Sequence, residues 1–236
     1  MPSLNYPQLK NKDKDGHFFI IKNGCGHLLK KEDNDKKLKI YESSEKETIY
    51  IENILNNDEY CLVGHELKPP FLEDDVKRAD FFFIFFQPRT KSASVYVYEI
   101  KKSIGNSDTI ISDMLLQCSA SMKFADFIVD SQEIFYNLNK SVGVFTENLN
   151  RNALKNLVAM KERQIKRSTS GFLGKKQNAQ GCISRSTLNI LKDFVAEKAV
   201  INGVTMKFDF REMSKETHSY SVKIKNGEMK KRIPSF

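Results

Sequence analysis

The chain has 236 residues, of which 40% are hydrophobic and 29% are charged, and its formal net charge is +8. This composition is typical of a globular protein with one substantial core, and it excludes an intrinsically disordered chain. No apolar run approaches the roughly 18 residues that cross a bilayer, and the positive charge favours a polyanionic partner, although a lysine-rich soluble surface has the same charge.

The first 43 residues are expected to form a β extension, followed by a single α/β domain over residues 44–236. In the extension, residues 17–22 and 38–41 have the composition of short strands that would pair as a hairpin. The N-terminus lacks the apolar segment of a signal peptide, and the four cysteines form no CxxC pair. These features predict free thiols in a cytoplasmic protein, or in a nuclear one if the source has a nucleus.

Residues 44–56 carry signals for two kinds of secondary structure. Ser44-x-x-Glu47 is a capping-box pattern, and the apolar residues after it fall on one helical face. Residues 48–52 also alternate as a strand does. The capping box favours a helix.

Residues 80–86 and 95–101 are the clearest strands in the chain. Both are apolar at nearly every position, which is typical of central strands that are covered on both faces. The polar segment 87–94 joins them as an antiparallel hairpin, and residues 59–63 form the strand before it.

The region after the hairpin alternates between helical and strand periodicity. The expected elements are helices over 111–127, 151–167 and 187–198, a strand over 141–146, a pair of strands over 204–210 and 220–224, and a flexible basic loop over 168–183.

Asp80 begins the first strand of the hairpin, and Glu99-x-Lys101 ends the second. Glu99 and Lys101 are two residues apart on a strand, so their side chains leave the same face. Paired positions in an unbulged hairpin of this length sum to about 181, which places Asp80 opposite Lys101 and beside Glu99. A shift of one residue would turn Asp80 to the other face.

Two carboxylates and a lysine at one point of a sheet suit the metal-assisted hydrolysis of a phosphodiester. Carboxylates on adjacent strands can hold Mg²⁺, which lowers the pKa of bound water and acts as a Lewis acid. A lysine beside them can orient the attacking water or stabilise negative charge as it develops. An exposed cross-strand ion pair uses the same residue types without this chemistry.

The pattern of Asp80, eighteen intervening residues and Glu99-x-Lys101 resembles the signature of the PD-(D/E)XK nuclease superfamily. The resemblance implies a restriction-endonuclease-like αβββαβ core, in which helices flank a mixed central sheet. The predicted helix over 44–56 would be the first element of this core. The residue before Asp80 is Ala79, where proline is common in the family.

The same resemblance assigns roles to individual residues. Asp80 and Glu99 would be metal ligands, the carbonyl group of Ile100 would be a third ligand, and Lys101 would be the catalytic lysine. Further candidates at the site are a polar residue on the helix after the motif, Gln117, and an acid from the first helix, Glu47 or Glu52.

The function implied is that of a Mg²⁺-dependent endonuclease or exonuclease, with Mn²⁺ as a substitute ion. Family frequency favours DNA over RNA, and a role in restriction, host defence or repair would fit. The alternative is a catalytically inactive protein of the same fold that binds nucleic acid or another protein.

Two other groups of residues are candidates for binding. The candidates for nucleic-acid contact are basic residues: Lys102, Arg163, Lys166, Arg167, Lys175 and Lys176. A solvated helix face would carry similar charges. Cys25-x-His27 and Cys61-x-x-x-His65 offer four zinc ligands, although buried cysteines and surface histidines account for them more simply.

Overall fold

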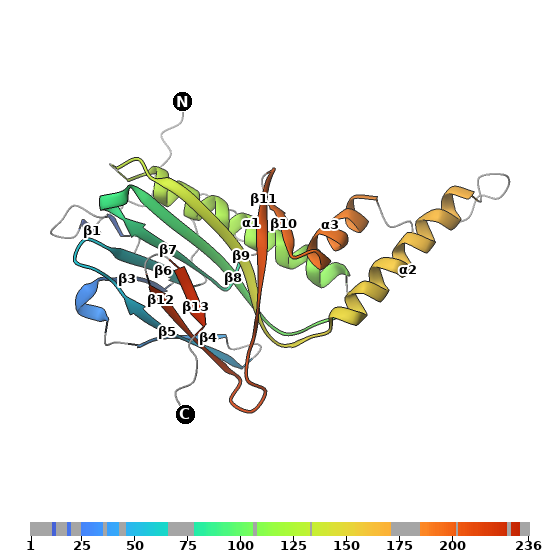
Figure 1. Ribbon diagram of the computed structural model, residues 1–236, viewed down its shortest axis with the longest axis horizontal. Coiled ribbons are helices and arrows are strands. Elements are labelled where there is room, and N and C mark those ends of the chain that lie inside the picture. The colour runs from blue at the N-terminus through green and yellow to red at the C-terminus, as the bar shows by residue number, and fades with distance from the viewer. Residues whose placement is uncertain are drawn as a thin grey trace.

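The computed structural model describes residues 11–12, 18–19, 25–34, 37–42, 46–65, 78–105, 108–132, 134–170, 185–201, 203–225 and 228–231. Within these parts, the chain forms three layers, in which a seven-stranded sheet lies between a layer of helices and a four-stranded sheet (Figure 1). The prediction of a mixed α/β fold with a mixed central sheet is confirmed. One face of that sheet, however, is covered by a second sheet and not by a helix.

The seven-stranded sheet mixes parallel and antiparallel pairs. In spatial order its strands are β10 (Lys198–Ile201), β11 (Val204–Glu212), β9 (Asn137–Leu149), β8 (Ser92–Ile104), β7 (Phe81–Gln87), β6 (Tyr60–His65) and β3 (Cys25–Leu29). The pairs from β3 to β8 are antiparallel, whereas β9 runs parallel to both β8 and β11. Helix α1 (Asp108–Asp130) forms the crossover between the parallel strands β8 and β9.

The four-stranded sheet joins segments from the two ends of the chain. In spatial order its strands are β13 (Glu228–Lys231), β12 (Ser219–Lys225), β5 (Glu47–Ile54) and β4 (Lys37–Glu42). Strand β12 runs parallel to β5, and the other two pairs are antiparallel. Strands β1 (Asn11–Lys12) and β2 (Phe18–Phe19) form a separate pair. Strands β3 and β4, from the segment expected to be an N-terminal extension, therefore each join one of the two main sheets.

The predicted helices are confirmed as α1, α2 (Arg151–Ser170) and α3 (Arg185–Val195). Helix α3 ends before residues 198–201, which form β10, and so it is shorter than predicted. No helix among the described residues is both long and apolar enough to cross a membrane. Most of the basic loop predicted over 168–183 lies outside the described residues.

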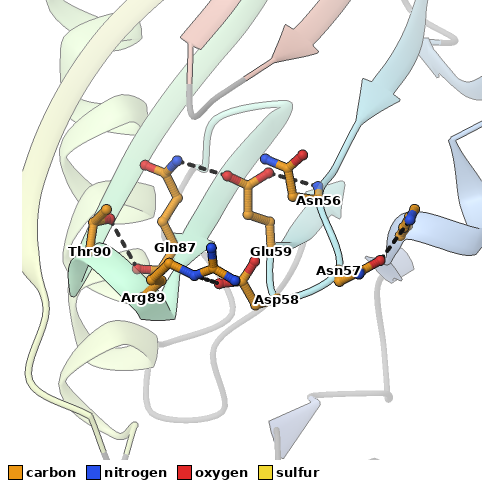
Figure 2. Close-up of a pocket in the computed structure, with 8 residues that line it drawn as sticks. Asn56, Asn57, Asp58, Glu59, Gln87, Arg89 and Thr90 are labelled. Carbon is orange, nitrogen blue, oxygen red and sulfur yellow. Dashed lines mark hydrogen bonds and ion pairs between the residues drawn. The ribbon is translucent and has the colours of Figure 1, made fainter.

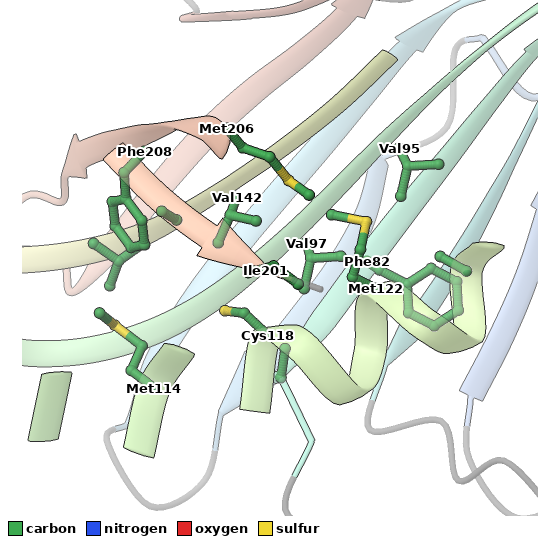
Figure 3. Close-up of a cluster of buried hydrophobic side chains, with 14 of the residues drawn as sticks. Phe82, Val95, Val97, Met114, Cys118, Met122, Val142, Ile201, Met206 and Phe208 are labelled. Atoms are coloured by element: carbon green, nitrogen blue, oxygen red, sulfur yellow. The ribbon is translucent and has the colours of Figure 1, made fainter. Parts of the chain in front are cut away.

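Strand β7 is apolar from Phe81 to Phe86 because both of its faces are covered. Its even-numbered residues from Phe82 to Phe86 pack in the core beneath the helices, and its odd-numbered residues from Phe81 to Phe85 pack against the four-stranded sheet. Figure 3 shows the helical side of this core, where the side chains of α1 that lie over the sheet include Met114, Cys118 and Met122.

Residues 47–54 form strand β5, so the predicted helix over 44–56 is wrong. Ile49 and Ile51 are fully buried between the two sheets, as the strand alternation of this segment requires. The ladders to β4 and β12 supply backbone hydrogen bonds on both sides of β5, and this tertiary pairing outweighs the helical capping pattern.

Two predicted pairings are also wrong. Residues 38–41 pair with β5, and the described part of residues 17–22, Phe18–Phe19, pairs with β1. Residues 220–224 pair with β5 and β13 and not with residues 204–210. In both cases the observed partner is β5. Because residues 44–56 were predicted to be a helix, β5 was not considered as a pairing partner.

The β7–β8 hairpin has a tighter connection than predicted. A single 3₁₀ turn joins the strands, and β7 pairs with β8 as far as Phe81 with Tyr98. The register therefore differs from the predicted one by two residues. Because side chains alternate with a period of two, Asp80 keeps the predicted face, but it lies across from Glu99 and not from Lys101.

Candidate active site

Asp80, Glu99 and Lys101 come together at one end of the β7–β8 hairpin, on the face covered by α1. Asp80 directly precedes β7, and the other two residues lie in β8. The Nζ atom of Lys101 is 3.4 Å from Oε1 of Glu99. The Glu99 side chain is fully buried, whereas 24% of the Lys101 side chain is exposed, so the site reaches the surface through the lysine. We refer to Asp80 and Glu99 as the acid pair.

Backbone amides hold both carboxylates of the acid pair. The N–H of Asp80 donates to Oε2 of Glu99 at 2.9 Å, and the N–H of Ile100 donates to Oδ2 of Asp80 at 2.6 Å. Hydrogen bonds to a charged acceptor are among the stronger ones, so each carboxylate has a defined position. The N–H and C=O groups of one strand residue point to the same side. The Ile100 carbonyl therefore leaves β8 on the side of Asp80.

The acid pair is an unfavourable place for two negative charges. Burial, followed by the charge of Asp80 and a hydrogen bond between the two carboxyl groups, raises the pKa of Glu99 to about 9, and Lys101 opposes this shift only in part. Burial and then the charges of the acid pair also raise the pKa of Cys118, which places this α1 residue next to the site. Carboxyl groups this close share a proton, and a bound cation would release it.

The stability of the metal-free protein is expected to fall as the pH rises from about 4.5 to about 9. In this range the folded protein keeps a proton on Glu99 that the unfolded chain has lost, so the free energy of unfolding decreases by up to about 1.4 kcal/mol per pH unit. Urea unfolding in EDTA at several pH values measures this slope. The Glu99→Gln variant should have a flatter profile, and equal slopes in the two proteins would contradict the assignment.

Two polar residues of α1 fix the segment that leads into Asp80. Oγ of Ser121 accepts a hydrogen bond from the N–H of Ala79 at 2.9 Å, and Nε2 of Gln117 donates to the carbonyl of Arg78 at 3.3 Å. A proline at position 79 would have no N–H to donate. Ala79 can therefore make the hydrogen bond to Ser121 that a proline could not make. Gln117 contacts the backbone two residues before Asp80, so its contact positions Asp80.

The two acids considered as additional ligands lie elsewhere. Glu52 is in β5 and forms an ion pair with Lys223 at 3.6 Å. Glu47 begins β5 and lies with Glu147 and His218, in the layer between the two sheets. The seven-stranded sheet separates this layer from the acid pair. The expectation that either acid joins the acid pair depended on the helix over 44–56, and it is wrong for the same reason.

Comparison with family models, curated proteins and solved structures found no match. What the site can do follows from the chemistry of its own residues. Two carboxylates on adjacent strands can bind a divalent cation, and a lysine beside them can stabilise negative charge.

The candidate nucleic-acid-binding residues fall in two described places. Lys102 follows the motif in β8 and is exposed. Helix α2 carries the second group and extends away from the sheets (Figure 1). Its exposed basic residues include Arg163, Lys166 and Arg167. Two further candidates lie outside the described residues: Lys175 and Lys176.

A polar pocket of about 440 Å³ lies at the other end of the hairpin, beside the β7–β8 turn (Figure 2). Glu59 accepts hydrogen bonds from the N–H of Asn56 and the side-chain amide of Gln87, and Arg89 forms an ion pair with Asp58. These lining groups bind one another. The length of β7, roughly 20 Å, separates them from the acid pair, so the pocket is not part of the candidate active site.

The four possible zinc ligands are spread along the β3–β6 ladder. Cys25 pairs with His65 at one end of the ladder, and Cys61 pairs with Leu29 at the other. Cys61 is fully buried in the apolar core, and this burial strongly raises the pKa of its thiol. The structure thus favours the simpler account, in which Cys61 is a core residue with a free thiol.

Proposed function

We propose that the protein is a metal-dependent nuclease that hydrolyses phosphodiester bonds in nucleic acid, with DNA favoured over RNA. The observation that carries this proposal is the meeting of the Asp80 and Glu99 carboxyl groups, with the Lys101 ammonium group 3.4 Å from Glu99. The site also reaches the protein surface, where a polymeric substrate could approach it.

The acid pair suits a divalent cation. Oε1 of Glu99 is buried and accepts no hydrogen bond from any residue that the structure describes. Asp80 and Glu99 would hold Mg²⁺ or Mn²⁺, with the Ile100 carbonyl on the same side of β8. When bound, the ion would lower the pKa of an attacking water and act as a Lewis acid toward the phosphate.

Lys101 supplies the second part of the chemistry. Its ammonium group can orient a water molecule or stabilise the negative charge that develops on the phosphate. The negative charge of the acid pair stabilises the positive charge of Lys101, and the partial exposure of the lysine leaves it within reach of a substrate. The acids thus have the role of ligands and the lysine that of the charge stabiliser.

The order of the strands and helices supports the nuclease proposal. Strands β6, β7 and β8 form an antiparallel meander, and α1 then leads to β9, which runs parallel to β8. This order is the one expected for the βββαβ part of the core that the resemblance implies. The helix that would precede it is replaced by β5, so the likeness covers the part of the core that carries the motif.

Positive charge is available at the residue after the motif and farther from the site. Lys102 is exposed immediately after the motif, and the exposed basic residues of α2 provide a second surface for phosphates. The formal net charge of +8 would attract a polyanion over longer distances. These features favour nucleic acid over a small phosphodiester.

The test is cleavage of labelled single-stranded DNA, double-stranded DNA and RNA by the purified protein with Mg²⁺ or Mn²⁺. We expect cleavage of at least one of these substrates, and we expect EDTA to stop it. Binding that is unchanged by EDTA, without cleavage of any substrate, would contradict the nuclease and support an inactive nucleic-acid-binding protein.

A further inference from the structure

Three metal-ligating side chains from distant parts of the chain meet on the opposite face of the seven-stranded sheet. Glu47 begins β5, Glu147 lies near the end of β9, and His218 lies in the turn before β12. One ligand atom from each residue lies within 4.8 Å of the other two. The group therefore bridges the four-stranded and seven-stranded sheets.

The fold holds each member of this group in place. The carbonyl of His218 accepts a hydrogen bond from the N–H of Thr48 at 2.9 Å, and Nδ1 of His218 contacts Oε1 of Glu147. The N–H of Met213 donates to the carbonyl of Thr146 at 2.7 Å, so the turn that carries His218 is attached to β9. The positions of the three ligands are thus set by backbone pairing.

The burial of the group is uneven in a way that suits a bound ion. The side chain of Glu47 is fully buried and that of Glu147 is 8% exposed, whereas 49% of the His218 side chain is exposed. Two carboxylates in a buried position repel each other, and a cation between them removes this repulsion. The exposed side at His218 gives an ion and a water molecule a way in.

We propose that Glu47, Glu147 and His218 form a zinc-binding site that links the four-stranded sheet to the seven-stranded sheet. One imidazole nitrogen and two carboxylate oxygens are ligands that Zn²⁺ accepts, and a water molecule can occupy a fourth position. Mg²⁺ and Ca²⁺ prefer sets of oxygen ligands, so the imidazole favours a transition metal. This site lies across the sheet from the acid pair and does not depend on the nuclease proposal.

The simpler alternative is that His218 and Glu147 form an ion pair with no metal. An ion pair would not respond to zinc, whereas a metal that binds only the folded protein raises its unfolding temperature. The two accounts therefore differ in a property that can be measured without any activity assay.

The experiment uses the full chain, stripped of metal by EDTA and then titrated with Zn²⁺ in a calorimeter and in thermal unfolding. We expect the unfolding temperature to rise, and we expect one equivalent of the bound zinc to depend on His218 and Glu147. His218→Ala and Glu147→Gln should each weaken zinc binding about tenfold or more. Far-UV circular dichroism establishes that the variants are folded, and His218→Ala changes only a half-exposed side chain.

The matched control is Glu216→Gln, which removes an exposed acid from the same turn and should bind zinc as the wild type does. Equal zinc affinity in the wild type and His218→Ala, or no zinc-dependent change in the wild type, would overturn the proposal. Glu99→Gln should keep the zinc response, so a failure of the nuclease proposal and a failure of the zinc site give different results.

Discussion

Replacing Lys101 by alanine is expected to reduce the rate of phosphodiester cleavage by about a hundredfold to a thousandfold, the effect typical of losing one group that stabilises transition-state charge. Its ammonium group lies 3.4 Å from the Glu99 carboxylate, so the substitution removes a positive charge from the proposed site. The measurement is single-turnover cleavage at saturating Mg²⁺. The loss should appear in the rate of the chemical step and not in substrate affinity.

The neighbouring lysine provides the control for this result. Lys102 is exposed and is the next residue along β8, so Lys102→Ala removes the same charge from outside the site. We expect Lys102→Ala to weaken substrate binding in a salt-dependent way and to leave the chemical step nearly unchanged. Equal losses in the chemical step for the two variants would mean that Lys101 has no special role.

Gly143→Ala is expected to destabilise the protein by about 3 kcal/mol, through overpacking in the core. Gly143 lies in β9 between Tyr98 of β8 and Asp209 of β11. An added Cβ would overlap the ring of Tyr98 and would lie 2.5 Å from the carbonyl oxygen of Asp209. Neither group can move easily, because one is a fully buried ring and the other is backbone.

The absence of a side chain at Gly143 also preserves a hydrogen-bonded network. The hydroxyl of Tyr98 donates to Oδ2 of Asp209 at 2.7 Å, and Arg211 binds both that carboxylate and the carbonyl of Met229. A displaced Tyr98 ring would break the first of these bonds. The network connects the two sheets, so its loss adds to the effect of the clash.

Urea unfolding of Gly143→Ala and Gly105→Ala separates this effect from a general cost of replacing glycine. A Cβ at Gly105 would meet no atom within 4 Å, so that variant should differ from the wild type by less than about 0.5 kcal/mol. Equal stability of Gly143→Ala and the wild type would show that the ring of Tyr98 can move to make room for a methyl group.

The parts of the fold that the sequence predicts well are those with a strong local pattern. The hairpin strands are apolar at nearly every position, and α1 repeats apolar residues at helical spacing, so both were found. Residues 44–56 were misassigned because their capping pattern is local, whereas the partner that makes them a strand, β12, lies at the far end of the chain. No pattern within a short segment reveals such a pairing.

The candidate site was predictable for a related reason. Side chains alternate between the two faces of a sheet, so the face on which Asp80, Glu99 and Lys101 meet depends on whether each position is odd or even along its strand. A register difference of two residues leaves each side chain on the same face. Glu147 and His218 were missed because their meeting with Glu47 requires three segments to converge. The available signal was Glu147, a carboxylate that follows a run of apolar residues within a buried strand, as Glu99 does.

The parallel pairing of β5 with β12 has a consequence for synthesis on the ribosome. Strand β5 emerges well before its partner β12, which lies much farther along the chain. Until then, the face of the central sheet that carries Phe81, Phe83 and Phe85 has no complete cover. Contacts of such long sequence separation form slowly, and an uncovered apolar face favours aggregation. The nascent chain therefore depends on the synthesis of β12, or on a chaperone, to protect this face.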